Sequence, residues 1–117
     1  MPRLISEPTR IPVPGGKLIS EHIGRVNTGH EAVSVAHMIA PANWEEPYQT
    51  PEFDEITLVL AGSVVVDHDG GSTIAVAGQS ILTSAGERIR YSSGPAGAEY
   101  VAVCLPAFAP DTVNRED

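Results

Sequence analysis

Two side chains of this sequence are of the kinds that transfer protons in enzymes, and each lies among apolar neighbours. Glu55 comes directly before a Val- and Leu-rich run, and His37 lies in a run of Val, Ala, Met and Ile. Burial raises the pKa of a carboxyl group by desolvation, toward the neutral pH at which it both accepts and donates protons. A titratable imidazole facing it across a cavity would complete an acid/base pair. We therefore take Glu55 and His37 as the candidate catalytic residues.

Each candidate also has a purely structural interpretation. The Glu55 carboxylate could form an ion pair with Arg88 or Arg90, and His37 could be a hydrogen-bonded core histidine. Polar and aromatic residues elsewhere would orient a small ligand or, alternatively, form the rim of the fold and anchor its loops. These candidate ligand-binding residues are Trp44, Tyr48, Gln49, Thr57 and Tyr91.

The elements that must position these residues are short β-strands. Ten prolines and eleven glycines divide the chain into brief apolar pieces rich in Val and Ile, too short for amphipathic helices. Asp69-Gly70-Gly71 has the composition of a tight hairpin turn, and Gly62 allows a sharp bend between two strands. Strands that recur every eight to twelve residues or so favour a sandwich or barrel. They are expected at 33–39, 56–60, 63–67, 72–76, 80–83, 89–92 and 99–105, with a short helix starting at 110–112.

Two segments resemble the signature motifs of the cupin superfamily. Six residues separate Glu55 from Gly62, which is the spacing of the glutamate and glycine that end the first cupin motif. Gly78 is followed by five residues and then Ser84-Ala85-Gly86, where the second motif has five residues and Pro-x-Gly. The resemblance covers residues 33–105 and implies an all-β cupin double-stranded β-helix, or jelly-roll barrel, with Glu55 facing its cavity. The chain is similar to ethanolamine-utilisation cupins, which keep the barrel and the glutamate while losing histidines.

The chain departs from the cupin pattern where the family carries metal-binding histidines. The first motif would place His-x-His just before Glu55, and residues 48–51 are instead Tyr, Gln, Thr and Pro. The last histidine would fall at Ile89. A lone carboxylate holds a divalent transition metal weakly compared with a set of imidazoles. We therefore predict no cofactor and no metal-binding residues, although a weakly bound divalent metal stays compatible with Glu55.

Strand alternation predicts which side chains share the cavity. Successive residues of a strand point to opposite faces, so an inward Glu55 also brings Thr57 inward. In the strand of His37, the set that contains this histidine is rich in Val and Ile and is expected to face the cavity. In the last strand, the sequence leaves open whether the set with Glu99 or the set with Tyr100 faces inward. The outward set of the Glu55 strand is Ile56, Leu58 and Leu60.

Composition limits the classes of partner. Seven Lys and Arg against fifteen Asp and Glu give a formal net charge of -8, which repels phosphate backbones and anionic lipid surfaces. No segment has the apolar length of a membrane span, and the N-terminus lacks the apolar run of a signal peptide. Cys104 is the single cysteine, which is compatible with a reducing compartment. We therefore expect a cytoplasmic protein that binds neither nucleic acid nor membranes.

The 117 residues fit one domain with two distinct ends. Four prolines and Gly15-Gly16 make residues 1–16 an extended N-terminal arm, residues 17–108 form a single cupin barrel, and residues 109–117 form a polar C-terminal tail. The outward set of the Glu55 strand is more apolar than a solvated face requires. We therefore expect a homodimer formed by sheet packing, with arm exchange as a variant.

These observations support a small cupin that binds a small organic molecule in its barrel. The first hypothesis is metal-independent acid/base chemistry at Glu55, of the isomerase, cyclase or lyase type. The alternatives are a non-catalytic binding or sensing module and a metal-dependent enzyme with unusual ligands. The sequence leaves open which of these applies, and so whether the protein is an enzyme.

Overall fold

β-Strands are the regular elements of the computed structural model, which describes residues 1–116. These residues contain no helix, and therefore none long and apolar enough to cross a membrane. The all-β prediction is confirmed. The short helix expected at 110–112 is wrong, because Thr112 N donates to Ala109 O at 3.1 Å and closes a turn there. The strands are β1 (Thr9–Ile11), β2 (Leu18–Ile23), β3 (Ser34–Ala40), β4 (Asp54–His68), β5 (Gly71–Val76), β6 (Ser80–Thr83) and β7 (Arg90–Leu105).

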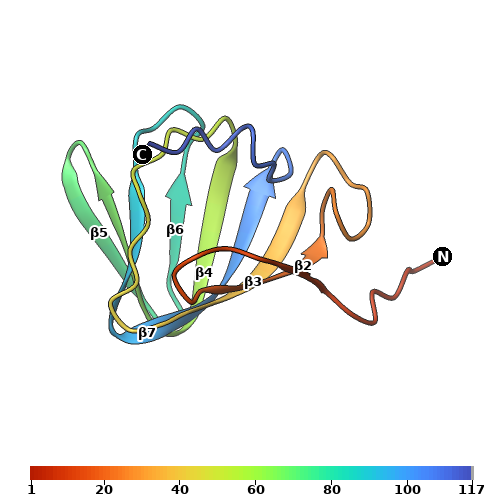
Figure 1. Cartoon of the computed structure of the whole chain (residues 1–117), viewed down its shortest axis with the longest axis horizontal. Coiled ribbons are helices and arrows are strands. Elements are labelled where there is room, and N and C mark those ends of the chain that lie inside the picture. Colours follow the sequence, from red (N-terminus) through yellow and green to blue (C-terminus); the bar gives the residue numbers. More distant parts are fainter. Residues whose placement is uncertain (117) are drawn as a thin grey trace.

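The strands form one antiparallel sheet that curls round a central space. Its order is β1-β2-β3-β7-β4-β5, and β6 pairs with the first part of β4. Figure 1 shows the hairpin of β4 and β5 on one side of the molecule and the β2–β3 pair on the other. The hairpin turn expected at Asp69-Gly70-Gly71 is present, with His68 paired to Gly71. The curled sheet therefore has a concave inner face and a convex outer face.

The two long strands bend at the same level, and glycines allow the bend. β4 is one strand of 15 residues where the sequence predicted two, and its pairing with β7 shifts between Val59 and Ala61 and again between Gly62 and Val64. Gly62 has a φ of 72° and Gly97 of β7 has a φ of 75°. A Cβ added to Gly62 would collide with the carbonyl oxygen of Gly97. The bend therefore requires a residue without a side chain. It allows β4 to pair with β6 before the bend and with β5 after it, while β7 pairs with both parts of β4.

The N-terminal arm is tied to the sheet by a strand that the sequence did not reveal. β1 pairs antiparallel with β2, and Ile11 lies opposite Ile19. Pro8 and Pro12 flank β1, which is tolerated because β1 is a three-residue edge strand. Figure 1 shows the first residues of the chain extending away from the barrel. The next part of the arm, residues 11–14, lines the central cavity.

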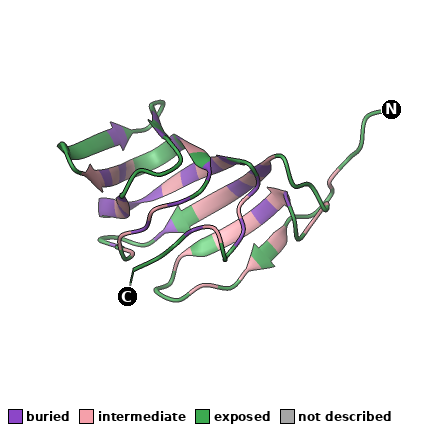
Figure 2. Cartoon of the chain, turned by 90° about the horizontal axis from the view of Figure 1, so that it is seen from above, coloured by how far each residue is buried: buried purple, intermediate pink, exposed green. Residues whose placement is uncertain are grey.

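Side chains alternate between a buried inner face and an open outer face, and Figure 2 shows the resulting bands along the strands. In β4, Thr57 and Val59 are fully buried, whereas Leu58 and Leu60 are 41% and 47% exposed, as alternation from Glu55 predicted. β7 resolves the choice that the sequence left open, because Tyr100, Ala102 and Cys104 are its buried set. The main core cluster includes Trp44, Val59, Val64, Val66, Ile81, Ile89, Tyr91 and Tyr100.

The C-terminal segment closes one end of the barrel. Val113 is buried in a cluster with Phe53 and Cys104, against which Phe108 packs. The rings of Phe53 and Phe108 meet edge to face with centroids 5.9 Å apart. The segment described as a polar tail on its composition thus has an apolar side, and Pro110 and residues 113 and 115 help to line the cavity.

Candidate functional site

A cavity of about 310 Å³ lies between the inner face of the sheet, the arm, the loop before β4 and the C-terminal segment. Its walls are mostly apolar, with contributions from Ala36, Met38, Phe53 and Phe108. A volume of this size suits a small organic molecule, and an apolar lining with a few polar groups is the usual composition of such sites. The ionisable and amide side chains that line it are Lys17, Glu21, Glu46, Gln49, Glu55 and Arg115.

Glu55 lies at the start of β4 and points into this cavity. It keeps some surface open to the cavity and is otherwise enclosed by protein. Desolvation raises the pKa of its carboxyl to about 7, with a further upward contribution from the Glu46 charge and a downward one from Lys17. The thiol of Cys104, directly opposite on β7, donates to Glu55 Oε1 at 3.7 Å. At neutral pH the group is therefore divided between acid and carboxylate, which is the condition for proton transfer in either direction.

Lys17 brings an amine to the same cavity. Its Nζ lies 4.2 Å from the ring centroid of Trp44 and 5.4 Å from that of Tyr100. Desolvation lowers the pKa of this amine, and the charges of Glu46 and Glu55 only partly oppose the shift. The aromatic faces attract the amine when it is charged, so its position is fixed without a salt bridge to any carboxylate of residues 1–116.

Glu46 and Arg115 form a second charged group at the cavity wall. Arg115 Nη2 lies 3.8 Å from Glu46 Oε2, and the Glu46 side chain is only 10% exposed. Desolvation raises the pKa of Glu46, while Lys17 and Arg115 lower it. The cavity therefore contains both signs of charge within an apolar wall.

Gln49 contributes an amide that has no partner of its own. Its backbone pairs with Ile89, with N–H···O distances of 2.8 and 2.9 Å that fix the loop against the strand. Its side-chain Oε1 is buried and accepts no hydrogen bond from residues 1–116. A buried acceptor without a partner costs stability, and because this atom has almost no open surface, the side chain must turn toward the cavity before a bound molecule can supply a donor.

The two phenols and the thiol that line the cavity, those of Tyr91, Tyr100 and Cys104, stay neutral at physiological pH. Tyr91 shares a hydrogen bond of 3.0 Å with Thr83 Oγ1, and desolvation raises the pKa of its phenol. Desolvation also raises the pKa values of Tyr100 and Cys104, and the nearby Glu55 charge adds to both shifts. These groups are therefore hydrogen-bond donors and not nucleophiles.

The expectation that His37 faces the cavity is wrong. The side chains of β3 that line the cavity are Ser34, Ala36 and Met38, so His37 lies on the outer face. Its Nε2 lies 2.7 Å from Glu99 Oε2 of β7. The β-branched residues of β3, Val35 and Ile39, face outward with it, which is why their hydrophobicity predicted the wrong orientation.

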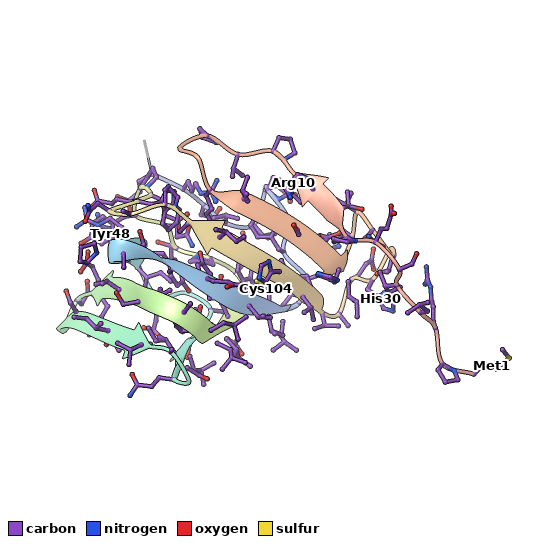
Figure 3. The ribbon with its side chains drawn as sticks, turned by 90° about the horizontal axis from the view of Figure 1, so that it is seen from below. Met1, Arg10, His30, Tyr48 and Cys104 are labelled. Atoms are coloured by element: carbon purple, nitrogen blue, oxygen red, sulfur yellow. The ribbon has the colours of Figure 1, made fainter. Side chains whose placement is uncertain are left out.

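The other residues that the sequence singled out are divided between the cavity and its surroundings. Gln49 and Tyr91 line the cavity, while Trp44 lines an adjoining, more open cavity that shares Lys17 with it. Thr57 lies on the inner face of the sheet but is fully buried and does not line the cavity. Its Oγ1 has no hydrogen-bond partner among residues 1–116. Tyr48 faces outward beneath two guanidinium groups, with Arg88 Cζ 3.9 Å from its ring centroid. Figure 3 shows Tyr48 at the end of the molecule opposite Met1.

Similarity to known proteins gives the family. A family model described as ethanolamine utilisation protein EutQ matches residues 25–109. The chain belongs to the EutQ family. A solved EutQ protein from Clostridium difficile is 21% identical, with a TM-score of 0.61 over 79% of this chain and 65% of that one. An RmlC-like cupin from Shewanella frigidimarina is 16% identical, with a TM-score of 0.72 over 90% of this chain and 89% of that one. The structural likenesses show a cupin-like fold, as the two motifs predicted.

A curated relative carries a EutQ-like segment within a longer protein. The endoribonuclease YbeY of Myxococcus xanthus is 40% identical over 107 residues, which make up 91% of this chain and 36% of that protein. The EutQ-family chain thus spans about a third of the length of this relative.

The donor set of this EutQ-family cavity does not fit the transition metal that cupins commonly hold. Within residues 1–116, no three His, Cys, Asp or Glu side chains are grouped so that they could hold a metal ion. None of the four histidines lines the cavity, and the positive group that most lowers the pKa of Glu55 is the amine of Lys17. A cation there would meet a positive group where cupins supply imidazoles. We therefore derive no metal-dependent step.

Three residues of the EutQ-family site were missed in the sequence, namely Lys17, Glu46 and Arg115. One signal was available, because Lys17 is the only lysine among the seven basic residues. Arg88 and Arg90, the partners that the structural interpretation offered for Glu55, instead pair outside the barrel with Glu116 at 2.7 Å and Asp67 at 2.9 Å. That interpretation is therefore wrong, since the positive charges that act on Glu55 are those of Lys17, just before β2, and Arg115, in the C-terminal segment.

Proposed function

We propose that this EutQ-family cupin binds a small organic molecule in its cavity and exchanges a proton with it through Glu55. The observation that carries this proposal is a carboxyl group that opens into a cavity of about 310 Å³ and whose pKa burial raises to about 7. Few carboxyls outside binding sites have a pKa so well matched to proton transfer at neutral pH.

The other cavity groups suit the orientation of such a molecule. Gln49 offers a buried amide oxygen that has no donor among residues 1–116, and Tyr100 offers a neutral phenol on β7, the strand paired with β4. The apolar walls exclude water from the remainder of the ligand, which strengthens each polar contact. Isomerisation, cyclisation, elimination and decarboxylation are the classes of reaction that a single acid/base group can serve.

The test is the Glu55→Gln variant, since glutamine keeps the shape of the side chain and cannot exchange a proton. A panel of small organic molecules is first screened for binding by ligand-observed NMR, and those that bind are followed for conversion to product. We expect Glu55→Gln to bind these molecules within a few-fold of the native affinity and to convert them at least about 10²-fold more slowly.

The matched control is Glu31→Gln, because the side chain of Glu31 is 84% exposed and lies outside the cavity lining. It should leave both binding and conversion unchanged. Full conversion by Glu55→Gln would overturn the catalytic part of the proposal, and the lack of any bound molecule in the screen would overturn all of it.

A sensing module without chemistry is the second candidate. It is favoured by the Myxococcus xanthus relative, in which a segment like this chain forms only 36% of a protein named for a ribonuclease activity. A module of this kind would bind its ligand without converting it, and Glu55→Gln would change affinity alone. The same screen therefore distinguishes the two candidates.

A further inference from the structure

We propose that Lys17 is a second catalytic residue, whose ε-amine condenses with the carbonyl group of a small aldehyde or ketone in the cavity to form an imine. The inference rests on the proposed function, because the carbonyl compound must first enter the Glu55 cavity. It goes further in naming the substrate class and the nucleophile.

The position of Lys17 is the first reason. Its Nζ lies over the rings of Trp44 and Tyr100, and the residue lines both the main cavity and the more open one beside it. Within residues 1–116, the amine forms no salt bridge with a carboxylate. The amine is thus held in place by ring faces, which leaves its nitrogen available to a molecule in the cavity.

A role in charge balance or solubility does not account for this lysine. The carboxylate of Glu46 has its partner in Arg115, and that of Glu55 accepts from the thiol of Cys104. Every other basic side chain of the protein is an arginine, so lysine is used once and inside the cavity. Arginine cannot form an imine, because its guanidinium stays protonated and is a poor nucleophile.

The chemistry follows from the pairing of an amine with an acid in one cavity. Desolvation lowers the pKa of Lys17, which increases the fraction of neutral, nucleophilic amine. That amine adds to the carbonyl carbon, and a proton moves from nitrogen to oxygen to give a carbinolamine. The protonated form of Glu55 then donates a proton to the hydroxyl group, which leaves as water. The products are an iminium ion on Lys17, one water molecule and the Glu55 carboxylate.

The iminium ion activates the carbon next to it for proton transfer. Its positive charge would occupy the place of the Lys17 ammonium over the two aromatic rings, near the carboxylates of Glu46 and Glu55. The Glu55 carboxylate can take a proton from the α-carbon, which gives a neutral enamine and restores the Glu55 acid. Isomerisation and decarboxylation both proceed from such intermediates.

The experiment traps the imine on the native protein. Propanal and pyruvate serve as probes with cyanoborohydride at neutral pH, which reduces an iminium ion to a stable secondary amine. Peptide mass mapping then finds the alkylated residue. Lys17 is the only lysine of the sequence, so free Nα-acetyl-lysine added to the same reaction is the reference for an exposed amine. We expect labelling of Lys17 to saturate with probe concentration and to exceed that of Nα-acetyl-lysine by tenfold or more for at least one probe. Labelling of Lys17 no faster than Nα-acetyl-lysine with both probes would overturn the inference.

Two variants separate this inference from the proposed function. Lys17→Arg should lose the adduct and the exchange of the probe's α-hydrogens with D₂O, and Lys17→Met should do the same if arginine disturbs folding. Glu55→Gln should keep the Lys17 adduct, formed tenfold or more slowly, and lose the α-hydrogen exchange. If a probe binds by ligand-observed NMR but never labels Lys17, the imine is excluded while cavity binding stands. If neither the probes nor the wider panel bind, both proposals fail.

Discussion

At the scale of single residues, Glu55 shows how a reactive group is maintained at the expense of stability. Its pKa rises to about 7 chiefly because folding removes its carboxyl from water. The positive charge of Lys17 opposes this shift, and the charge of Glu46 adds to it. Above neutral pH the folded protein therefore contains a charged carboxylate that is only partly solvated. This costs stability, and a neutral glutamine at position 55 would not incur the cost. A residue kept for structure would lose stability on this substitution, whereas a residue kept for its reactivity would gain it, so the stability of the variant reports on the role.

We predict that Glu55 makes the folded protein less stable as the pH rises. Its pKa is higher in the folded chain than the ordinary value of 4.5, so the folded state binds more protons between these two values. The favourable contribution is complete below about pH 4.5 and is lost as the pH rises through about 7. Relative to Glu55→Gln, the native protein should lose on the order of 3 kcal/mol of unfolding free energy over this range.

Urea unfolding of both proteins at several pH values between about 4.5 and 8 measures this difference. The comparison cancels the contributions of other groups, to the extent that the substitution leaves their pKa values unchanged. Glu31→Gln, which removes an exposed carboxylate, should follow the native profile. Parallel profiles for the native protein and Glu55→Gln would contradict the raised pKa.

At the scale of elements, the bend in the two long strands is what brings the site together. Gly62 and Gly97 adopt positive φ values at facing positions, and the backbone of one approaches that of the other too closely for a side chain. Because β4 continues through the bend, it carries Glu55 on one side of it and the hairpin with β5 on the other. The spacing of Glu55 and Gly62 in the first cupin motif thus has a structural cause. Glu55 faces the cavity from the first part of β4, and Gly62 bends the same strand seven residues later.

We predict that Gly62→Ala destabilises the fold more than an alanine at another positive-φ glycine. Both substitutions incur about 1–2 kcal/mol for a left-handed backbone with a side chain. Gly62→Ala also forces the new methyl group against Gly97 O, whereas Gly78, with a φ of 87°, has no atom within 4 Å of an added Cβ. Urea unfolding should therefore show a loss for Gly62→Ala that exceeds that of Gly78→Ala by at least about 1 kcal/mol. If both variants lost the same unfolding free energy, the backbone at Gly97 O would be moving away from the new methyl group without cost, which would contradict the prediction.

Alternation predicted the inner face of β4 because one residue determined its orientation. Once Glu55 faces inward, Thr57 must follow it, and the structure agrees. β3 offered no such residue, and its inward positions include the small Ser34 and Ala36 beside Met38, so the outward set of Val35, His37 and Ile39 was mistaken for core. Hydrophobicity distinguishes the two faces of a sheet only where one of them is solvated.

The polar half of the site could not be predicted in the same way. Lys17, Glu46 and Arg115 come from the turn before β2, the loop before β4 and the C-terminal tail, and their meeting depends on how these segments close over the barrel. No periodicity connects such segments, and β1, which ties the arm to the sheet, is only three residues long. The motifs therefore predicted the barrel and its glutamate, while the amine beside it became visible only in the folded chain.

At the scale of the whole molecule, the outer face of the sheet is unusually apolar for a surface. The pairing of strands aligns Leu82, Ile56, Val103 and Val35 in one row across β6, β4, β7 and β3. Leu82 is 69% exposed, and the neighbouring Leu58 is 41% exposed. His37 lies in the same cross-strand row as Leu58 and Val101, and its Nε2 is satisfied by Glu99 Oε2 at 2.7 Å. A continuous apolar sheet face of this kind commonly marks an interface.

We propose that a second copy of the chain covers this face, so that the protein is a homodimer formed by sheet packing. Leu58→Glu would bury a charge in the interface at a cost of several kcal/mol, because its own row across the sheet, Ser80, Leu58, Val101 and His37, contains no Lys or Arg and the imidazole of His37 is already hydrogen-bonded to Glu99. Light scattering after size-exclusion chromatography should give a dimer for the native protein at micromolar concentration and a monomer for Leu58→Glu, at about 0.15 M salt to screen the net charge of -8. Ile74→Glu is the control, because Ile74 is 62% exposed on β5, which pairs with the part of β4 beyond the bend. It should stay dimeric, and a native protein that is monomeric under these conditions would refute the interface.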